Sequence, residues 1–409
     1  MEQKKKVAII GTVGLPAQYG GFETLASHLV TNLSNEYDFT VYCSSKKYPK
    51  EKRLKEFNGA KLKYIPLDAN GVQSVLYDSW SILNALFSND VLIVLGVAGA
   101  WLFPILRLFT RKKIVVSIDG IEWKREKWGN MAKLYLWWAE KIAVKYSHID
   151  ISDNESIQDY TAIRYKSLSR IIEYGADHVL FVTPTDDDFK KYPFLHSQYS
   201  IKVCRIEPEN NVHVVLEAFS RMNNRKLVFI GNWDKSEYGQ ELKSRYSVYE
   251  NIIILDPIYD QRELDLLRGN ASLYVHGHSA GGTNPSLVEA MYLGLPVLAY
   301  GVSYNRTTTE SKAKYFRTAD EIVNFVSEMD NYVLQNLAYY MKEIAKRRYT
   351  WGNICRKYNL LVHEVLGIRQ KTNVNNQVAA LDIETLQANE IAHLQYSNLF
   401  FEKRNTKKN

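Results

Sequence analysis

Short apolar runs alternate with helical patterns along most of this 409-residue chain, and the alternation comes in two successive sets. The run Val7-Ala8-Ile9-Ile10 is nearly free of polar residues, as expected for a strand buried on both faces. The first set predicts strands at 6–10, 39–43, 61–65, 91–95, 113–118 and 148–151, and helices at 22–35, 73–87 and 131–146. This order is typical of a parallel sheet with helices on both faces.

The second set follows a break at 181–194, "FVTPTDDDFKKYPF", where prolines and an acidic run interrupt the pattern. It predicts strands near 200–204, 226–230, 251–255, 272–275 and 296–299, and helices near 209–222, 260–269 and 284–293. The fold class is therefore α/β, with two doubly wound, Rossmann-like domains. We expect a ligand cleft between the carboxyl ends of their strands.

The domain limits follow from these patterns. We expect a first Rossmann-like domain at 1–182, a second Rossmann-like domain with a terminal helix at 183–366 and a polar tail at 367–409. Beyond Thr318 the pattern is helical, and 345–366 predicts a long terminal helix with a break at Gly352. For the tail we expect one weak helix near 380–395 and otherwise disorder.

Composition excludes several classes of protein. Hydrophobic residues make up 46% and charged residues 24%, which indicates a folded globular chain. The three cysteines (Cys43, Cys204 and Cys355) are isolated and match no metal spacing, as expected in a reducing cytosol. We see no secretory signal and no bilayer-spanning stretch. The net charge of +7 is modest for this length, so nucleic acid is not an expected partner.

Aromatic and basic residues are mixed in two stretches, "WLFPILRLFTRKK" (101–113) and "EWKREKWGNMAKLYLWWAEKIAVKYS" (122–147). Such mixtures favour the surface of an anionic membrane. The apolar side of each stretch could equally be core. The composition leaves both interpretations open.

The first candidate site is the glycine loop "GTVGLPAQYGGFETL" (11–25), which lies between the first strand and a helix. Glycines 11, 14, 20 and 21 do not have the spacing of a dinucleotide-binding loop, which disfavours a nicotinamide or flavin site. The adjacent Gly20 and Gly21 indicate a polar ligand that the backbone approaches closely. A turn that simply requires glycine is the alternative.

The second candidate site is "HGHSAGGTNPSLVEAMYLGLPVLAY" (276–300). A strand ends at Val275, Gly281 and Gly282 follow, and Pro285 fits the first turn of the next helix. The N–H groups of 282–284 would bind a diphosphate. Glu289 lies one turn into the helix, where a carboxylate can accept two hydrogen bonds from a ribose diol.

These motifs, with "VCRIEPENNVHVVLEAFS" (203–220) and "DGIEWKREKWG" (119–129), resemble the retaining nucleotide-sugar glycosyltransferases of family 4, which have the GT-B fold. The resemblance covers nearly the whole chain, including a terminal helix at Trp351 that crosses back to the first domain. It is closest to the bacterial rhamnosyltransferases that build capsular or cell-wall polysaccharide.

The resemblance implies a retaining transferase that moves a sugar, L-rhamnose from dTDP-rhamnose, to a lipid-linked saccharide at the cytoplasmic face of the membrane. No cofactor or metal is expected. Its implied catalytic residues are Asp119, Arg205 and Glu289. The implied contacts of the sugar donor are Gly20, Gly21, Arg205, His278, Gly281, Gly282, Thr283, Asn284 and Glu289. Those on the acceptor side are Glu23, Asp119, Glu122 and Trp123.

Three positions depart from the family pattern. Gly281 stands where the family has the first of two glutamates, Asn210 where it has a lysine, and Asp119 where many relatives have a histidine. Two alternatives therefore stay open: a hexosyltransferase using UDP-glucose or UDP-galactose, and a non-catalytic binding or scaffold protein. A nucleotide-sugar epimerase or dehydrogenase is disfavoured, because this sequence lacks the glycine spacing of a dinucleotide-binding loop.

Two possible metal motifs are weak. His276 and His278 flank Gly277, but no third ligand is evident. The acidic run Asp186-Asp187-Asp188 falls in the expected interdomain linker.

Overall fold

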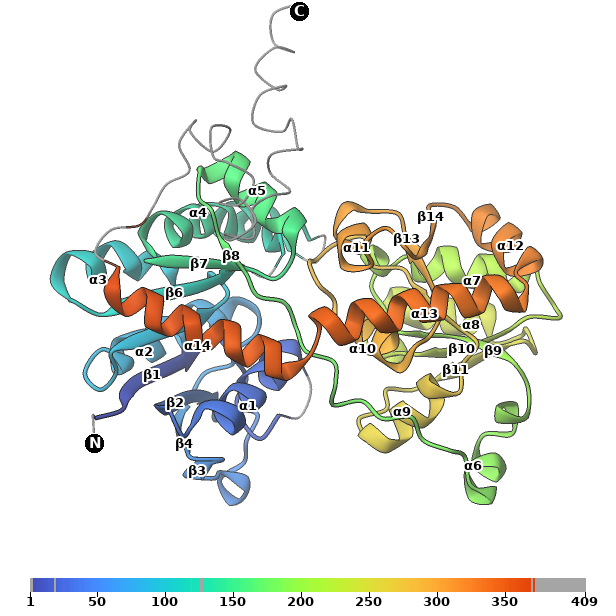
Figure 1. The fold of residues 1–409 in the computed structure, drawn as a ribbon, viewed down its shortest axis with the longest axis horizontal. Helices are drawn as coiled ribbons and strands as arrows, with labels where there is room; N and C mark the ends of the chain where they lie inside the picture. The colour runs from blue at the N-terminus through green and yellow to red at the C-terminus, as the bar shows by residue number, and fades with distance from the viewer. Residues whose placement is uncertain (1–2, 18–19, 119, 126–127, 369–370, 372–409) are drawn as a thin grey trace, which may run out of the picture. The chain divides into compact units, whose positions relative to one another are not determined.

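The computed structural model describes residues 3–17, 20–118, 120–125, 128–368 and 371. The chain forms two compact units (Figure 1). Unit 1 comprises Met1–Glu173 and Cys355–Asn409, and unit 2 comprises Tyr174–Ile354. The first division thus comes nine residues before the expected boundary at 182, and the last helix returns to unit 1.

Unit 1 is built on an eight-stranded sheet with the order β3-β4-β2-β1-β5-β6-β7-β8. All neighbours pair in parallel except β3 and β4, which are antiparallel. The strands are β1 Lys5–Ile10, β2 Tyr37–Ser44, β3 Glu56–Phe57, β4 Ala60–Ile65, β5 Val91–Leu95, β6 Lys113–Ile118, β7 Ile149–Ser152 and β8 Arg170–Ile171. Val7 to Ile10 are fully buried, as their apolar run predicts.

The helices of unit 1 are α1 Gly21–Leu33, α2 Ser74–Ala85, α3 Phe103–Phe109, α4 Asn130–Tyr146, α5 Glu155–Tyr165 and, from Cys355 on, α14 Trp351–Gly367, whose first turn belongs to unit 2. Apolar side chains of α2, α3, α4 and α5 form one cluster with Ala8, Ile10 and Val94 of the sheet. Because side chains alternate along a strand, these helices cover the same face of the sheet. α14 lies against α1, where the Cys355 thiol is 3.7 Å from the His28 carbonyl oxygen.

Unit 2 has a six-stranded, fully parallel sheet with the order β11-β10-β9-β12-β13-β14. Its strands are β9 Tyr199–Val203, β10 Lys226–Ile230, β11 Ile252–Leu255, β12 Leu273–His276, β13 Val297–Tyr300 and β14 Lys314–Phe316. Its helices are α6 Asp186–Lys191, α7 Val212–Ser220, α8 Glu237–Tyr246, α9 Gln261–Gly269, α10 Pro285–Leu293, α11 Ser303–Thr308, α12 Ala319–Glu328 and α13 Asn331–Arg348. Apolar clusters occupy both faces of this sheet.

The expected strands and helices of both sets are confirmed, with limits that differ by about three residues at most. The expected break at Gly352 is wrong. α13 ends at Arg348, and Gly352 lies in the first turn of α14, because the chain turns at Tyr349 and Thr350 instead. The expected helix near 380–395 lies outside the described residues.

Several short elements were not expected from the sequence. β8 has two residues and β14 three, which is too short to show alternation. The expected linker also contains α6, whose N-cap Thr185 forms a capping box with Asp188. Local capping therefore gives the acidic run a helical structure.

Candidate functional site

Two loops of unit 2 lie side by side at the carboxyl edge of its sheet. They follow the neighbouring parallel strands β9 and β12. The Asn211 side-chain amide donates a 2.8 Å hydrogen bond to the Gly277 carbonyl oxygen. Ser279 donates to the Glu209 carbonyl oxygen, through its backbone N–H and its hydroxyl, at 2.8 Å each. The tertiary structure thus brings together two motifs that lie about 70 residues apart in the sequence.

The second loop leads into the amino terminus of α10. Asn284 is the N-cap: its Oδ1 accepts hydrogen bonds from the Ser286 N–H at 3.1 Å and the Ser286 hydroxyl at 2.8 Å. Pro285 is the first helical residue. Gly281 has a φ of 130°, and a Cβ there would meet no atom within 4 Å. The backbone conformation at position 281 therefore requires glycine. The amino terminus of α10, with its free N–H groups, can attract an anion.

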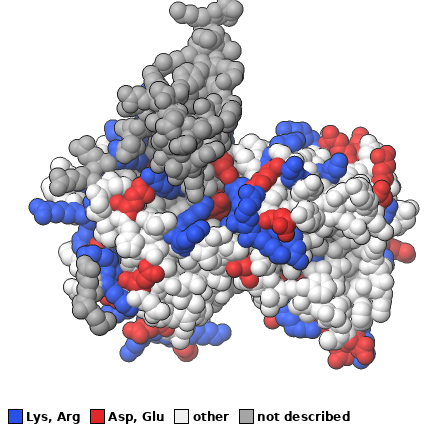
Figure 2. All heavy atoms as spheres, viewed as in Figure 1, with Lys and Arg blue, Asp and Glu red and all other residues white. Residues whose placement is uncertain are grey.

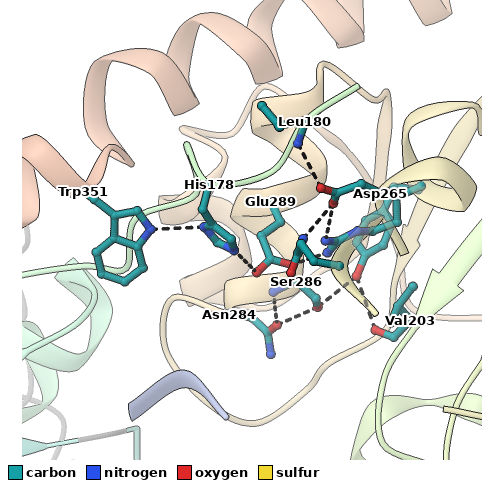
Figure 3. Close-up of polar contacts among 11 residues, drawn as sticks. His178, Leu180, Val203, Asp265, Asn284, Ser286, Glu289 and Trp351 are labelled. Atoms are coloured by element: carbon teal, nitrogen blue, oxygen red, sulfur yellow. Dashed lines mark hydrogen bonds and ion pairs between the residues drawn. The ribbon is translucent and has the colours of Figure 1, made fainter. Parts of the chain in front are cut away.

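Glu289 is held from two sides within unit 2 (Figure 3). One carboxylate oxygen forms an ion pair with the Arg268 guanidinium. The other is 3.2 Å from Nε2 of His178, and only 15% of the Glu289 side chain is exposed. Burial alone would raise the pKa of Glu289, but Arg268 and His178 outweigh it and lower this pKa to about 2. The carboxylate is thus ionised and fixed in orientation.

His178 is oriented in turn by Trp351. The indole Nε1–H of Trp351 donates to Nδ1 of His178 at 3.1 Å. Since Nδ1 accepts, the ring proton lies on Nε2 and points at Glu289. Trp351 is itself fixed, because its backbone N–H donates to the Asp177 carboxylate at 2.7 Å. A Cβ on Gly175 would lie 2.5 Å from the indole ring.

Arg268 and Asp265 extend this network into the protein. Arg268 is 1% exposed, and its guanidinium is 3.3 Å from the Asp265 carboxylate, which is 2% exposed. Asp265 also accepts a 3.0 Å hydrogen bond from the Leu180 N–H (Figure 3). Burial opposes the charged form of Arg268, but the two carboxylates outweigh it and raise its pKa. A buried cation between two carboxylates is therefore stable as an ion.

The Arg205 side chain is 37% exposed, and one of its guanidinium nitrogens is 3.7 Å from Glu207. The Asn210 side-chain amide donates to the Arg205 carbonyl oxygen at 2.7 Å, and Asn210 is buried. Asn210 therefore shapes the Arg205 loop and supplies no charge to the site.

The association of Lys202 with His276 was not predicted from the sequence. Both are buried at this sheet edge. In the described part of the chain, neither the Lys202 ammonium nor either His276 ring nitrogen has a hydrogen-bond partner. His276 stacks on His278 with 4.4 Å between ring centroids. Burial lowers the pKa of both, and Lys202 lowers that of His276 further. A lysine inside the apolar run "YSIKV" was the available signal.

In unit 1, the Glu23 side chain stabilises the glycine loop through hydrogen bonds. Its carboxylate accepts hydrogen bonds from the Thr12 hydroxyl at 2.9 Å and the Val13 N–H at 2.6 Å. Gly20 has a φ of 130°, and a Cβ there would lie 1.9 Å from the same carboxylate. Gly21 begins α1. Glu23 is 6% exposed, and its carboxylate stabilises this loop.

The loop after β6 is held by its own side chains. Glu122 accepts from the Trp128 indole N–H at 2.9 Å and pairs with Arg125 at 2.8 Å. The Trp123 indole N–H donates to the Tyr160 hydroxyl at 3.1 Å. Asp119, the expected catalytic residue of this loop, lies outside the described residues.

Two family models match the sequence. Residues 4–177 match a model described as a domain of unknown function (DUF1972). Residues 184–343, which include Arg205 and Glu289, match the model described as glycosyl transferases group 1. The chain carries a group 1 glycosyltransferase domain.

Solved structures similar to this glycosyltransferase have the same two-domain fold. Sucrose-phosphate synthase of Thermosynechococcus elongatus has a TM-score of 0.75 at 14% identity, over 89% of this chain and 99% of that chain. HepE of Anabaena, in complex with UDP, has a TM-score of 0.68 at 13% identity, over 88% of this chain and 100% of that chain. The catalytic domain of starch synthase IV of Arabidopsis thaliana, bound to ADP and acarbose, has a TM-score of 0.65 at 13% identity, over 89% of this chain and 99% of that chain. The expected GT-B fold is thus confirmed.

A search of curated proteins found no match. In the described ranges of the glycosyltransferase, no three His, Cys, Asp or Glu side chains are placed to hold a metal ion. Asp188, from the acidic run, instead pairs with Arg262 at 2.8 Å.

Proposed function

We propose that this glycosyltransferase moves L-rhamnose from dTDP-rhamnose to a lipid-linked saccharide in capsular or cell-wall polysaccharide synthesis, with retention of anomeric configuration. The observation that carries the transferase role is the Glu289 carboxylate, fixed by Arg268 and His178 one turn into α10. HepE structures with UDP and UDP-glucose support a nucleotide sugar as donor, because that protein shares this fold.

Glu289 suits a ribose diol. A carboxylate offers about four lone-pair sites, and the two contacts to Arg268 and His178 use one on each oxygen. The remaining sites can accept two hydroxyl hydrogen bonds. Because its partners hold the carboxylate ionised, these bonds are charge-assisted and strong.

The diphosphate would lie between Arg205 and the amino terminus of α10. Arg205 is exposed enough to reach a ligand, and the N–H groups near Gly282 and Thr283 favour negative charge. Such groups stabilise the diphosphate as it leaves. We propose that the donor's own phosphate takes the proton of the acceptor hydroxyl, so that no carboxylate nucleophile is needed. His278, beside the same loop, is a further proposed contact of the donor.

The 6-deoxy sugar is the most specific part of the proposal. It rests on the motifs of the glycine loop and of 119–129, and on Asp119 in the place of a histidine that would contact the outer sugar hydroxyl. A methyl group there has no such hydrogen bond to make. Since an apolar site rejects an added hydroxyl only weakly, we expect slow side activity with hexose donors. Gly20 and Gly21 would approach the sugar ring, and Asp119 and Trp123 the acceptor.

The test is a panel of dTDP-rhamnose, UDP-glucose, UDP-galactose and a GDP-sugar. Thermal shift measures binding, and release of nucleoside diphosphate with a lipid-linked acceptor measures turnover. We expect the largest shift and fastest turnover with dTDP-rhamnose. A preference for a UDP-hexose would contradict the assignment of rhamnose as the transferred sugar but would still support a transferase. Binding without turnover, which Gly281 and Asn210 would explain, would favour a scaffold protein.

Two variants sharpen the test. Glu289→Gln keeps the shape but loses the charge, and we expect nucleotide affinity to fall by about 1–3 kcal/mol. Arg205→Ala should lower turnover far more than stability, because Arg205 is partly exposed. Wild-type turnover in Arg205→Ala would show that another residue neutralises the leaving group.

A further inference from the structure

The outer face of α2 and its flanks is apolar. Val72, Leu76, Trp80, Leu83 and Phe87 recur every three or four residues and are 83%, 62%, 53%, 47% and 91% exposed. A surface helix normally presents charged residues on this face. Between 64 and 106, however, the only charged residues are three aspartates, and Asp78 among them is buried. From the sequence, residues 73–87 were expected only to form a helix between two strands.

This stripe continues onto neighbouring segments of unit 1. The Trp101 indole N–H donates to the Ser79 hydroxyl at 2.9 Å, which places Trp101 beside α2. Leu108 and Phe109 of α3 are each 76% exposed. The exposed apolar side chains of this face are hereafter called the apolar layer. They are Val72, Leu76, Trp80, Leu83, Phe87, Trp101, Ile105, Leu108, Phe109, Met131, Leu134, Trp137 and Trp138. They are 13 of the 23 large hydrophobic side chains exposed in the described part of the chain, so this is no random scatter.

Two grooves mark this face. One, of about 560 Å³, is lined mainly by Leu67, Leu76, Trp80, Leu83 and Phe87. The other, of about 510 Å³, combines Trp123, Leu134 and Trp137 with two lysines, Lys124 and Lys133. An apolar floor beside lysine ammonium groups suits lipid chains below anionic headgroups.

Charge is concentrated in the same region. Residues 101–146 contain ten basic and four acidic side chains, so they carry six of the chain's seven net positive charges. Of the acidic ones, Glu140 is buried and Glu122 is paired. On the visible face of unit 2, basic and acidic side chains are interspersed (Figure 2, right).

We infer that the apolar layer of α2, α3 and α4 is the surface by which the protein docks onto an anionic lipid bilayer. Four of its members are tryptophans, the side chain most suited to a bilayer interface. A second copy is a poorer occupant, because a symmetric pair would bring the two basic rims together. In the ranges that the structure describes, no helix is long and apolar enough to cross a membrane. The inference deepens the proposed function and rests on it only for the lipid-linked acceptor.

The experiment is vesicle flotation of the full chain. Vesicles are phosphatidylcholine alone or a 3:1 mixture with phosphatidylglycerol, at low and high salt. We expect binding to the anionic vesicles, weakened by salt. Trp80→Glu/Phe87→Glu should lower the partition coefficient by about tenfold or more. Lys133→Glu/Lys141→Glu should lower it by a similar factor, and only on anionic vesicles.

The matched control is Val248→Glu/Tyr332→Glu, which adds the same charges at side chains of unit 2 that are 76% and 73% exposed. We expect it to bind vesicles as wild type does. Brominated lipids should quench tryptophan fluorescence of wild type but not of Trp80→Glu/Phe87→Glu. The thermal shift with dTDP, measured on every variant, reports folding and the donor site independently of lipid.

Two outcomes would overturn the inference. One is wild-type protein that ignores anionic vesicles at low salt, whatever its response to dTDP. The other is a lipid-free dimer in sedimentation that Trp80→Glu/Phe87→Glu converts to monomer, which would make this face an interface between copies. Loss of the dTDP shift with intact vesicle binding would instead count against the proposed function alone.

Discussion

Arg268 and Glu289 form an ion pair inside unit 2, with 1% of the Arg268 side chain and 15% of the Glu289 side chain exposed. The pair links an orienting network, from Trp351 and His178 on one side to Asp265 on the other. This arrangement makes the carboxylate both a structural group and a proposed ligand of ribose. Its two roles can be separated by pH and by mutation.

The stability that Glu289 contributes should depend on pH. Its pKa in the folded protein is about 2, below its ordinary value near 4.5. The ionised group therefore stabilises the fold above about pH 4.5, and this contribution is lost as pH falls toward 2. Its size is about 3 kcal/mol. We expect Glu289→Gln to have a lower Tm than wild type at pH 6, with a difference that shrinks toward pH 3. A difference independent of pH would contradict the ion pair.

Trp351→Phe should loosen Glu289 without emptying the site. The variant keeps an aromatic ring but loses the N–H that fixes the His178 tautomer. We expect nucleotide affinity to fall by about 1 kcal/mol, measured by calorimetry. Trp233→Phe is the matched control, because it removes a buried indole hydrogen bond, to the Leu255 carbonyl, elsewhere in unit 2. Equal losses of affinity in both variants would show a general packing effect.

Gly20→Ala should destabilise unit 1 more than Gly96→Ala. Both glycines have positive φ, 130° and 100°, so both variants incur backbone strain of about 1–3 kcal/mol. Only at Gly20 would the new methyl group also strike Glu23, whereas nothing lies within 4 Å at Gly96. We expect urea unfolding to show a larger loss for Gly20→Ala. Equal losses would mean that the Glu23 side chain moves aside freely.

Lys202→Met should stabilise unit 2. Lys202 is fully buried, and its ammonium has no hydrogen-bond partner among the described residues. A buried, uncompensated charge opposes folding, and methionine has a similar shape without it. We expect the Tm to rise, with the difference largest at pH values below the lowered pKa of Lys202, where the lysine is charged. A lower Tm would show that the ammonium has a stabilising partner in solution.

The expected elements and the two doubly wound domains could be predicted from the sequence because both rest on local patterns, whereas the GT-B fold was implied by the resemblance to family 4. Apolar strand runs, helical spacing and glycine at strand ends each act over a few residues. Residues 277–284 and the Pro285 helix were found in this way, and the structure places them as expected. The resemblance to family 4 rested on the same local motifs.

What the local patterns could not show is which distant residues complete each group. The partners of Glu289 are Arg268, 21 positions away, and His178, more than a hundred positions away. Glu23 lies in a motif typical of a ligand loop, and its carboxylate accepts hydrogen bonds from Thr12 and Val13 that stabilise this loop. Hydrogen bonds and ion pairs of this kind depend on how strands and helices pack, which no spacing along the chain records.

The apolar layer shows the same division. The sequence by itself determined that residues 73–87 form a helix, and that 101–113 and 122–147 mix aromatic and basic residues. Only the tertiary structure decided which of those side chains are buried, since the sheet covers one face of each helix and leaves the other exposed. A hydrophobic residue favours burial wherever it lies, but the packing of the whole unit determines whether the protein itself provides that burial.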